Sequence, residues 1–206
     1  MDRSENIRIS HYVHETAVLG PGRRFAVWFQ GCKKRCEGCI NPQGQQLDGG
    51  QLVAVEELLA KIGRQKGLQG ITISGGEPFL QYDGLKRLIE GVRRETQLDI
   101  MLYSGYSLQE LQDRHGSGLA ALLRQVDIFI DGEYRKEEDH GTIYRGSDNQ
   151  NIYFFTERFA AFREEMYGTR NRDIEFLADG EEVYMVGVPP KDFYPELIKK
   201  IMRKKP

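Results

Sequence analysis

The chain has 206 residues, of which 39% are hydrophobic, enough for one sizeable core or for a core with an appendage. Its 29 basic and 31 acidic residues nearly cancel, and a net charge of -2 argues against a general nucleic-acid-binding protein. No apolar run approaches the roughly 20 residues of a membrane-spanning helix, and no signal peptide is evident. Because its cysteines are clustered rather than spread as disulfide pairs, we expect a cytoplasmic protein without a membrane partner.

The first strongly apolar stretch, residues 25–30, is rich in β-prone side chains and leads directly into all three cysteines. Cys32, Cys36 and Cys39 have the spacing Cys-x3-Cys-x2-Cys. Thiolates are soft ligands that suit iron–sulfur clusters, zinc and copper(I). Structural zinc sites and ordinary electron-transfer clusters usually have a fourth protein ligand. Three thiolates on one loop therefore indicate a four-iron cluster with one open iron.

Zinc is the alternative at this loop, since a histidine from elsewhere in the fold could complete the coordination. The four candidates are His11, His14, His115 and His140. None of them lies within two to five residues of a cysteine, the spacing that is typical of zinc motifs. A non-catalytic zinc- or cluster-binding interaction protein stays open as a different functional class, although it leaves a glycine–glutamate motif further along the chain unexplained.

After the cysteines, helical and strand patterns alternate. Amphipathic helices are predicted for residues 52–66, 83–96 and 108–111, the last resuming over 117–125. Strands are predicted for residues 70–74, 99–103 and 126–130. This alternation is typical of βαβ units and predicts an α/β fold with a parallel sheet.

Distinctive residues follow the predicted strands. Gly75, Gly76 and Glu77 come directly after one strand, and Ser104 and Asp131 mark the ends of the next two. Ligands of such sheets bind beyond the carboxyl ends of the strands, so we expect these segments and the cysteine loop to line one site. Two glycines let the backbone approach a ligand closely, and a carboxylate can accept hydrogen bonds from an ammonium group.

The pattern changes after about residue 150. Residues 174–178 and 182–188 flank the dipeptide Asp179-Gly180, which is a strong hairpin turn signal. A helix is predicted from about residue 192. We expect an antiparallel appendage or closing edge rather than a second full domain.

The runs CKKRCEGC at 32–39 and SGGEP at 74–78 together resemble the radical S-adenosylmethionine superfamily. Four further runs are similar to the activating proteins of anaerobic ribonucleotide reductase, which are glycyl-radical-enzyme activases: GPGRR at 20–24, YSGYSLQEL at 103–111, DIFIDGEY at 127–134 and YRGSDNQ at 144–150. The resemblance implies a partial (β/α) barrel of the radical S-adenosylmethionine type in a core domain of residues 1–152. Residues 153–206 would be a C-terminal extension, a hairpin and a helix, packed on that core.

The resemblance also implies cofactors and the residues that hold them. A four-iron four-sulfur cluster would be held by Cys32, Cys36 and Cys39. S-adenosylmethionine would chelate the fourth iron and would be positioned by Gly75, Gly76, Glu77, Ser104 and Asp131.

The implied reaction is reductive cleavage of S-adenosylmethionine to a 5′-deoxyadenosyl radical, which takes a hydrogen atom from a glycine Cα of a partner enzyme. That partner would be a glycyl radical enzyme such as anaerobic ribonucleotide reductase. A flavodoxin or ferredoxin would donate the electron, and Lys33, Lys34 and Arg35 either steer an acidic reductant or form a solvated loop. The alternative is a stand-alone radical enzyme that modifies a peptide or small molecule, because the extension lies beyond the resemblance.

Overall fold

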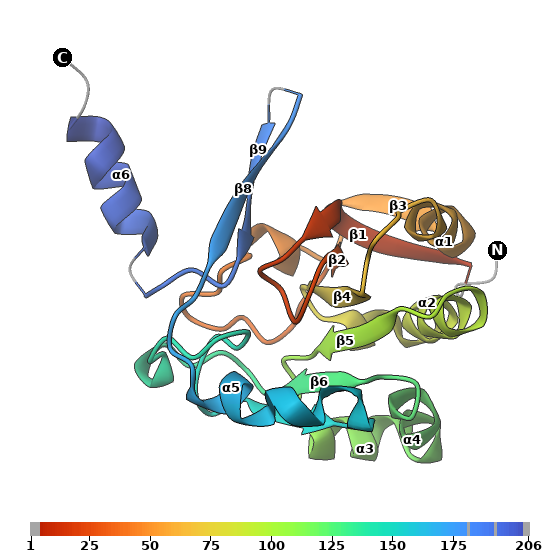
Figure 1. The fold of residues 1–206 in the computed structure, drawn as a ribbon. Helices are drawn as coiled ribbons and strands as arrows, with labels where there is room; N and C mark the ends of the chain where they lie inside the picture. The colour runs from red at the N-terminus through yellow and green to blue at the C-terminus, as the bar shows by residue number, and fades with distance from the viewer. Residues whose placement is uncertain (1–4, 181, 192, 204–206) are drawn as a thin grey trace.

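A mixed sheet of seven strands carries the fold (Figure 1). The computed structural model describes residues 5–180, 182–191 and 193–203. The strands of this sheet are β1 (Asn6–Thr16), β2 (Arg24–Phe29), β3 (Gln51–Ala54), β4 (Gly70–Gly75), β5 (Asp99–Tyr103), β6 (Ile128–Asp131) and β7 (Asn151–Phe154). The helices are α1 (Val55–Gly63), α2 (Tyr82–Glu95), α3 (Leu108–His115), α4 (Ser117–Leu123), α5 (Arg163–Gly168) and α6 (Phe193–Arg203). A separate antiparallel hairpin is formed by β8 (Ile174–Asp179) and β9 (Glu182–Gly187).

The centre of the large sheet is parallel. The strand order is β3-β1-β2-β4-β5-β6-β7, in which β2, β4, β5 and β6 run in the same direction. The outer strands β1, β3 and β7 pair in antiparallel fashion. The carboxyl ends of the parallel strands therefore meet at one edge, where the cysteine loop and the segments after β4, β5 and β6 begin. The predicted α/β fold is confirmed, with antiparallel strands added on both sides of its parallel centre.

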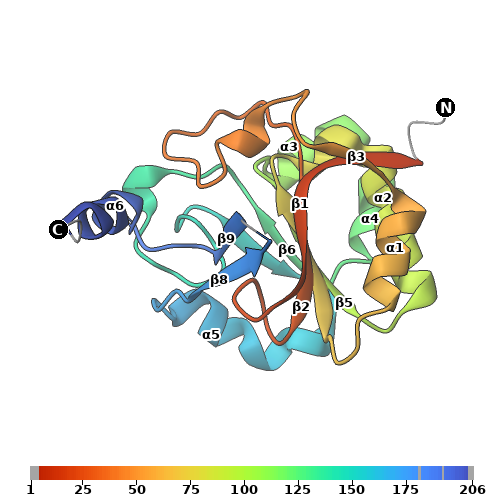
Figure 2. The same cartoon turned by 90° about the horizontal axis from the view of Figure 1, so that it is seen from above.

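The two faces of the sheet are covered by different parts of the chain. Phe25 and Val27 of β2 are buried in the main core with residues of α1 and α2. Ala26, on the other face of the same strand, packs with Val186 of β9. Figure 2 shows α1 and α2 on one side of the sheet and β8, β9 and α5 on the other. The hairpin predicted from Asp179-Gly180 is thus present and packs on the face opposite the helices.

The extension also covers the β5–β6 part of that second face. Met101 and Ile130 of the sheet are buried together with Phe159 and Met166, which lie beyond β7. Strand β7 spans Asn151–Phe154, so the expected boundary between residues 152 and 153 falls within a strand. Helix α6 projects from the body of the protein in both views (Figures 1 and 2).

Several elements differ from the sequence-based expectations, most clearly the first predicted helix and the first strand. The predicted helix of residues 52–66 begins only at Val55, because Gln51–Ala54 pairs with β1 as an edge strand. The long strand β1 was not predicted. Its pairing with β2 has register shifts between Ile9 and His11 and between Val13 and Thr16, which interrupt the two-residue alternation that identifies a strand. Within the described ranges, no helix combines the length and apolarity of a membrane span.

Candidate functional site

The cysteine loop connects the end of β2 to a short 3-10 helix. The Cys32 N–H donates to the carbonyl of Gln45 at 3.3 Å, and the Cys39 N–H donates to the carbonyl of Cys36 at the same distance. All three cysteines are free, with Cys32 buried and the other two half-buried. The loop therefore presents three unpaired thiols from a backbone that is partly fixed by hydrogen bonds.

Burial is the main influence on the pKa of two of the thiols. It raises the pKa of Cys32 and of Cys36, while backbone hydrogen bonds oppose that rise. At Cys32 the opposing donor is the N–H of Lys34, 3.4 Å from Sγ, and at Cys36 it is the backbone of Tyr134. Hydrogen bonds to sulfur stabilise a thiolate and tune a bound iron–sulfur cluster.

The three thiols of this loop are soft donors of the kind that an iron–sulfur cluster takes. In the described part of the chain, no three His, Cys, Asp or Glu side chains are close enough together to hold one metal ion. A four-iron cluster binds each thiolate at a different iron, so its ligands surround a shared volume rather than a point. The four histidines contact residues outside this loop. His11 stacks on Trp28, and His115 stacks on Tyr82. His14 is hydrogen-bonded to Gln65, and His140 is hydrogen-bonded to Asp148.

The glycine pair after β4 lets the protein's own backbone pack closely. Gly75 has φ +126°, and a Cβ there would lie 2.2 Å from the backbone N of Phe29. A Cβ at Gly76 would lie 2.3 Å from the carbonyl oxygen of Gly31 and 2.5 Å from that of Gly44. These contacts lie well below any real Cβ distance, so both positions require glycine. The close approach predicted toward a ligand is, in the structure, an approach to both ends of the cysteine loop.

Glu77 follows the glycines and is completely buried. Its carboxylate accepts hydrogen bonds from the N–H of Phe79 at 3.0 Å, the hydroxyl of Ser104 at 3.0 Å and the N–H of Gly105 at 2.7 Å. Burial raises the pKa of Glu77 to about 7, although these hydrogen bonds oppose the rise. A carboxylate has about four acceptor positions, so three donors leave one acceptor position of Glu77 unused. The structure thus brings together two predicted site residues, Glu77 and Ser104.

Asp131 is placed differently. It lies at the end of β6 and is buried, but its carboxylate oxygens accept hydrogen bonds from the N–H of Leu108, the N–H and side-chain amide of Asn151, and the hydroxyl of Tyr153. Four donors match the approximate acceptor capacity of a carboxylate. Asp131 therefore joins the start of α3 to β7, and the structure shows no contact between it and Glu77.

Sequence reasoning missed the part played by Lys34. Its ammonium forms an ion pair with Glu110 at 2.9 Å and lies 4.6 Å from the centre of the Tyr106 ring. Only 17% of its side chain is exposed, whereas the flanking residues Lys33 and Arg35 are exposed. The available signal was the run Ser107-x-x-Glu110, a capping box that places a carboxylate beside the end of β5.

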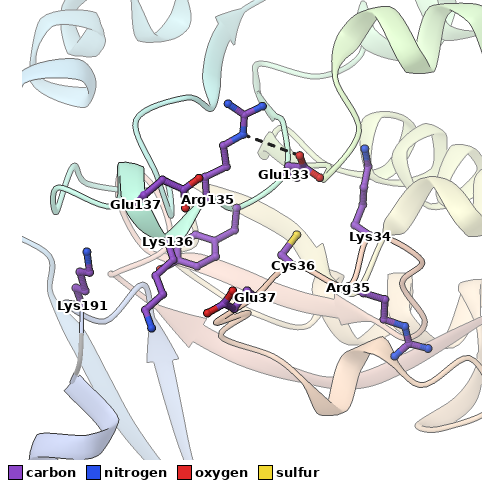
Figure 3. A pocket seen from close by; sticks show the side chains of 10 residues that line it. Lys34, Arg35, Cys36, Glu37, Glu133, Arg135, Lys136, Glu137 and Lys191 are labelled. Atoms are coloured by element: carbon purple, nitrogen blue, oxygen red, sulfur yellow. Dashed lines mark ion pairs between the residues drawn. The ribbon is translucent and has the colours of Figure 1, made fainter.

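A cavity of about 580 Å³ opens beside Cys36 (Figure 3). One wall is residues 34–37 of the cysteine loop, the opposite wall is residues 133–137, and Lys191 of the extension closes a third side. Eight of its ten lining residues are charged. The cavity gives a polar ligand access to one of the three thiols.

Comparison with known proteins shows the family to which the chain belongs. The model of the 4Fe-4S single cluster domain family matches residues 18–153. The anaerobic ribonucleoside-triphosphate reductase-activating protein of Enterobacteria phage T4 is 32% identical over 146 residues, covering 68% of this chain and 89% of that protein. Its counterpart in Vibrio cholerae is 33% identical over 147 residues, covering 68% and 92%.

A second kind of activase is also similar. The pyruvate formate-lyase-activating enzyme of Clostridium pasteurianum is 36% identical over 118 residues, covering 53% of this chain and 49% of that enzyme. The family resemblance drawn from the cysteine and glycine motifs is confirmed. The chain belongs to the 4Fe-4S single cluster domain family, among the anaerobic ribonucleoside-triphosphate reductase-activating proteins, and is an enzyme of the radical S-adenosylmethionine activating type.

Proposed function

We propose that this protein generates a glycyl radical on a partner enzyme of the anaerobic ribonucleotide reductase kind. Two relatives named for activation of that reductase match over most of their own length, which supports the proposal. The observation that carries it is the buried carboxylate of Glu77, which has capacity for one more donor and lies at the same sheet edge as the cysteine loop. Joint binding of a cluster and S-adenosylmethionine requires thiols for the cluster and, near them, an anion that can receive the ammonium group of the cofactor.

We assign cluster ligation to Cys32, Cys36 and Cys39. With a four-iron cluster and S-adenosylmethionine bound, the chemistry supplied is reductive cleavage of the sulfonium and hydrogen-atom abstraction from a glycine of the partner. The protein binds and orients these groups and excludes water from them. The backbone N–H groups directed at Cys32 and Cys36 favour the thiolate form that ligation needs.

For S-adenosylmethionine, we propose that Glu77 receives the ammonium group. A cation at that position would lower the pKa of Glu77 from its raised value and hold the carboxylate charged. Gly75 and Gly76 bring the strand end against the cysteine loop, and Ser104 orients Glu77 through their hydrogen bond. Asp131 contributes to this site from the end of β6, by holding the start of α3 in place.

We further propose that residues 1–152 form an incomplete (β/α) barrel of the radical S-adenosylmethionine type and that residues 153–206 are an extension packed on it. Four parallel strands with helices on one face and site segments at one edge support the barrel. Burial of Val186 and Met166 against sheet residues supports the packing.

A flavodoxin or ferredoxin is the electron donor that we propose, with the protein acting in the cytoplasm. Lys33 and Arg35 are exposed beside Cys36 and have no ion pair among the described residues. Exposed cations near a redox centre accelerate encounter with an acidic protein.

The test is anaerobic reconstitution with iron and sulfide, followed by reduction and addition of S-adenosylmethionine and the anaerobic ribonucleotide reductase of the same organism. A glycyl radical signal on the reductase, together with 5′-deoxyadenosine, is the expected result. 5′-Deoxyadenosine without any radical on the reductase would favour the stand-alone enzyme that acts on a peptide or small molecule. Stoichiometric zinc and no cluster would overturn the proposal, and Cys36→Ala should abolish the cluster.

A further inference from the structure

We infer that Lys34 is a positioning residue that fixes the cysteine loop against the end of β5 and thereby sets the cysteines relative to Glu77. The inference rests on the proposed function, because it takes the cysteines as cluster ligands and Glu77 as the cofactor-binding carboxylate. It says that the ion pair between Lys34 and Glu110 keeps these two groups at the right distance from each other. Lys34 lies inside the cysteine loop, between Cys32 and Cys36.

The side chain of Lys34 crosses from that loop to the segment after β5. Its ammonium contacts both carboxylate oxygens of Glu110, at 2.9 and 3.1 Å. The Tyr106 ring lies 4.6 Å from the same ammonium and 4.0 Å from the guanidinium of Arg114. A cation over an aromatic ring is attracted by the ring's negative face. Lys34 therefore has two partners on the segment that follows β5.

The receiving carboxylate is itself held in place. Glu110 accepts a hydrogen bond from the N–H of Ser107 at 2.7 Å, while the Ser107 hydroxyl accepts one from the N–H of Glu110. This capping box begins α3, so Glu110 is fixed to a helix rather than to a mobile loop. Lys34 and the Ser107 N–H both lower the pKa of Glu110, which keeps it charged.

The stem of Lys34 lies beside the partners of Glu77. A Cβ built on Gly105 would lie 3.4 Å from Cγ of Lys34 and 3.4 Å from a carboxylate oxygen of Glu77. The N–H of Gly105 donates to that same carboxylate at 2.7 Å. At the other end, the backbone N–H of Lys34 donates to Sγ of Cys32. Lys34 thus donates a hydrogen bond to a proposed cluster ligand, and its stem lies close to the residue whose N–H holds the proposed cofactor carboxylate.

Lys33 and Arg35 provide the contrast within the same loop. Both are exposed, and neither has an ion pair in the part of the chain that the structure describes. The exposed charges of Lys33 and Arg35 can attract an acidic reductant, whereas the charge of Lys34 is paired with that of Glu110. The three basic residues expected to act as one group therefore divide into a structural cation and two surface cations.

Lys34→Met removes the charge and keeps the length of the side chain, and Lys33→Met is the matched control. We expect reconstituted Lys34→Met to hold normal iron and sulfide but to bind S-adenosylmethionine about 10- to 100-fold more weakly. The change that S-adenosylmethionine causes in the electron paramagnetic resonance spectrum of the reduced cluster should be lost or broadened. Lys33→Met should match the wild type in affinity, spectrum and melting temperature.

A second variant covers the case in which Lys34→Met cannot hold a cluster. Glu110→Gln removes the partner charge far from the cysteines in sequence and keeps the capping box, because glutamine also accepts the Ser107 N–H. Weakened S-adenosylmethionine binding in Glu110→Gln with an intact cluster supports the inference. Wild-type affinity and spectrum in Glu110→Gln overturn it.

Glu77→Gln separates failure of this inference from failure of the proposed function. If Glu77→Gln weakens binding while the Lys34 and Glu110 variants do not, only the positioning role is lost. If Glu77→Gln also binds S-adenosylmethionine normally, the proposed cofactor site itself is wrong.

Discussion

Arg172 of the extension and Asp139 of the loop after β6 form an ion pair of 2.9 Å, with 2% and 5% of their side chains exposed. The Arg172 guanidinium also donates to three backbone carbonyls of that loop: those of Thr142, Arg145 and Gly146. The run YRGSDNQ, part of the resemblance to the activases, is therefore held by a residue from outside the region of resemblance.

Replacing Arg172 with alanine should destabilise the protein by about 3–5 kcal/mol, because it leaves the Asp139 carboxylate buried without a cation. Denaturant unfolding of the apoprotein measures this. The control is Arg170→Ala, which removes a half-exposed arginine that pairs with Asp148, and it should cost at most about 1 kcal/mol. Equal effects of the two substitutions would show that the buried pair does not hold the extension.

Gly76→Ala should lower the stability by on the order of 3 kcal/mol, because its Cβ meets two backbone carbonyl oxygens that cannot move as side chains do. Gly63→Ala is the matched control, since Gly63 is the last residue of α1 and a Cβ there meets nothing within 4 Å. That control should raise the stability by about 0.5–1 kcal/mol. A melting temperature of Gly76→Ala at or above that of the wild type contradicts the close backbone contact.

The stability of the apoprotein should depend on Glu77 between pH 4.5 and about 7. The pKa of Glu77 is raised from 4.5 to about 7, so the folded state binds the proton more tightly than the unfolded state does. Its contribution is fully present below pH 4.5 and is lost as the pH rises through 7. The loss is on the order of 3 kcal/mol.

Comparison of the wild type with Glu77→Gln isolates this contribution, because other titrating groups are common to both proteins. His11, whose pKa is lowered to about 4 by burial, acts in the opposite direction and cancels in the difference. The unfolding free energy of Glu77→Gln relative to wild type should therefore increase between pH 4.5 and 8. A difference that is constant with pH would mean that Glu77 titrates normally in the folded protein.

Truncation after residue 152 should give an unstable or aggregating protein. It cuts strand β7 and uncovers apolar side chains on the second face of the sheet, among them Met101 and Ala26. Dye binding to exposed apolar surface and thermal melting provide the measurement. Truncation after Lys191 removes α6 but leaves the hairpin and Arg172, so its melting temperature should stay close to that of the whole chain. A stable, soluble 1–152 fragment would contradict the integral role of the extension.

Much of the parallel centre of the sheet could be predicted from the sequence, because apolar residues recur without interruption at the spacing of a strand or a helix. Strand β5 begins and ends where the pattern places it, and α2 does so within one residue. Strand β1 could not be predicted, since its irregular register removes the alternation. Arg24 shows a second limit: it is fully buried, with a bond of 2.5 Å to Asp99, while the adjacent Arg23 is half exposed. Composition does not distinguish two neighbouring arginines.

The site residues were predicted from their positions after strands, but their interactions were not. Whether Asp131 has free acceptor capacity depends on Asn151 and Tyr153, which are twenty or more residues away in sequence. The same holds for Lys34, whose partner Glu110 is 76 residues away. Such pairings arise from tertiary packing. The sequence contains the capping box Ser107-x-x-Glu110, but it does not identify the residue with which the Glu110 carboxylate pairs.

In the described part of the chain, both broad faces of the large sheet are covered by the protein itself, one by α1 and α2 and the other by the hairpin and the segment around α5. The carboxyl-end edge of the parallel strands is where a charged cavity of about 580 Å³ reaches one thiol, that of Cys36. Because Lys191 lies in the wall of this cavity, the C-terminal extension takes part in shaping the surroundings of Cys36. A change in the extension can therefore alter what reaches that thiol without any change in the cysteine loop itself.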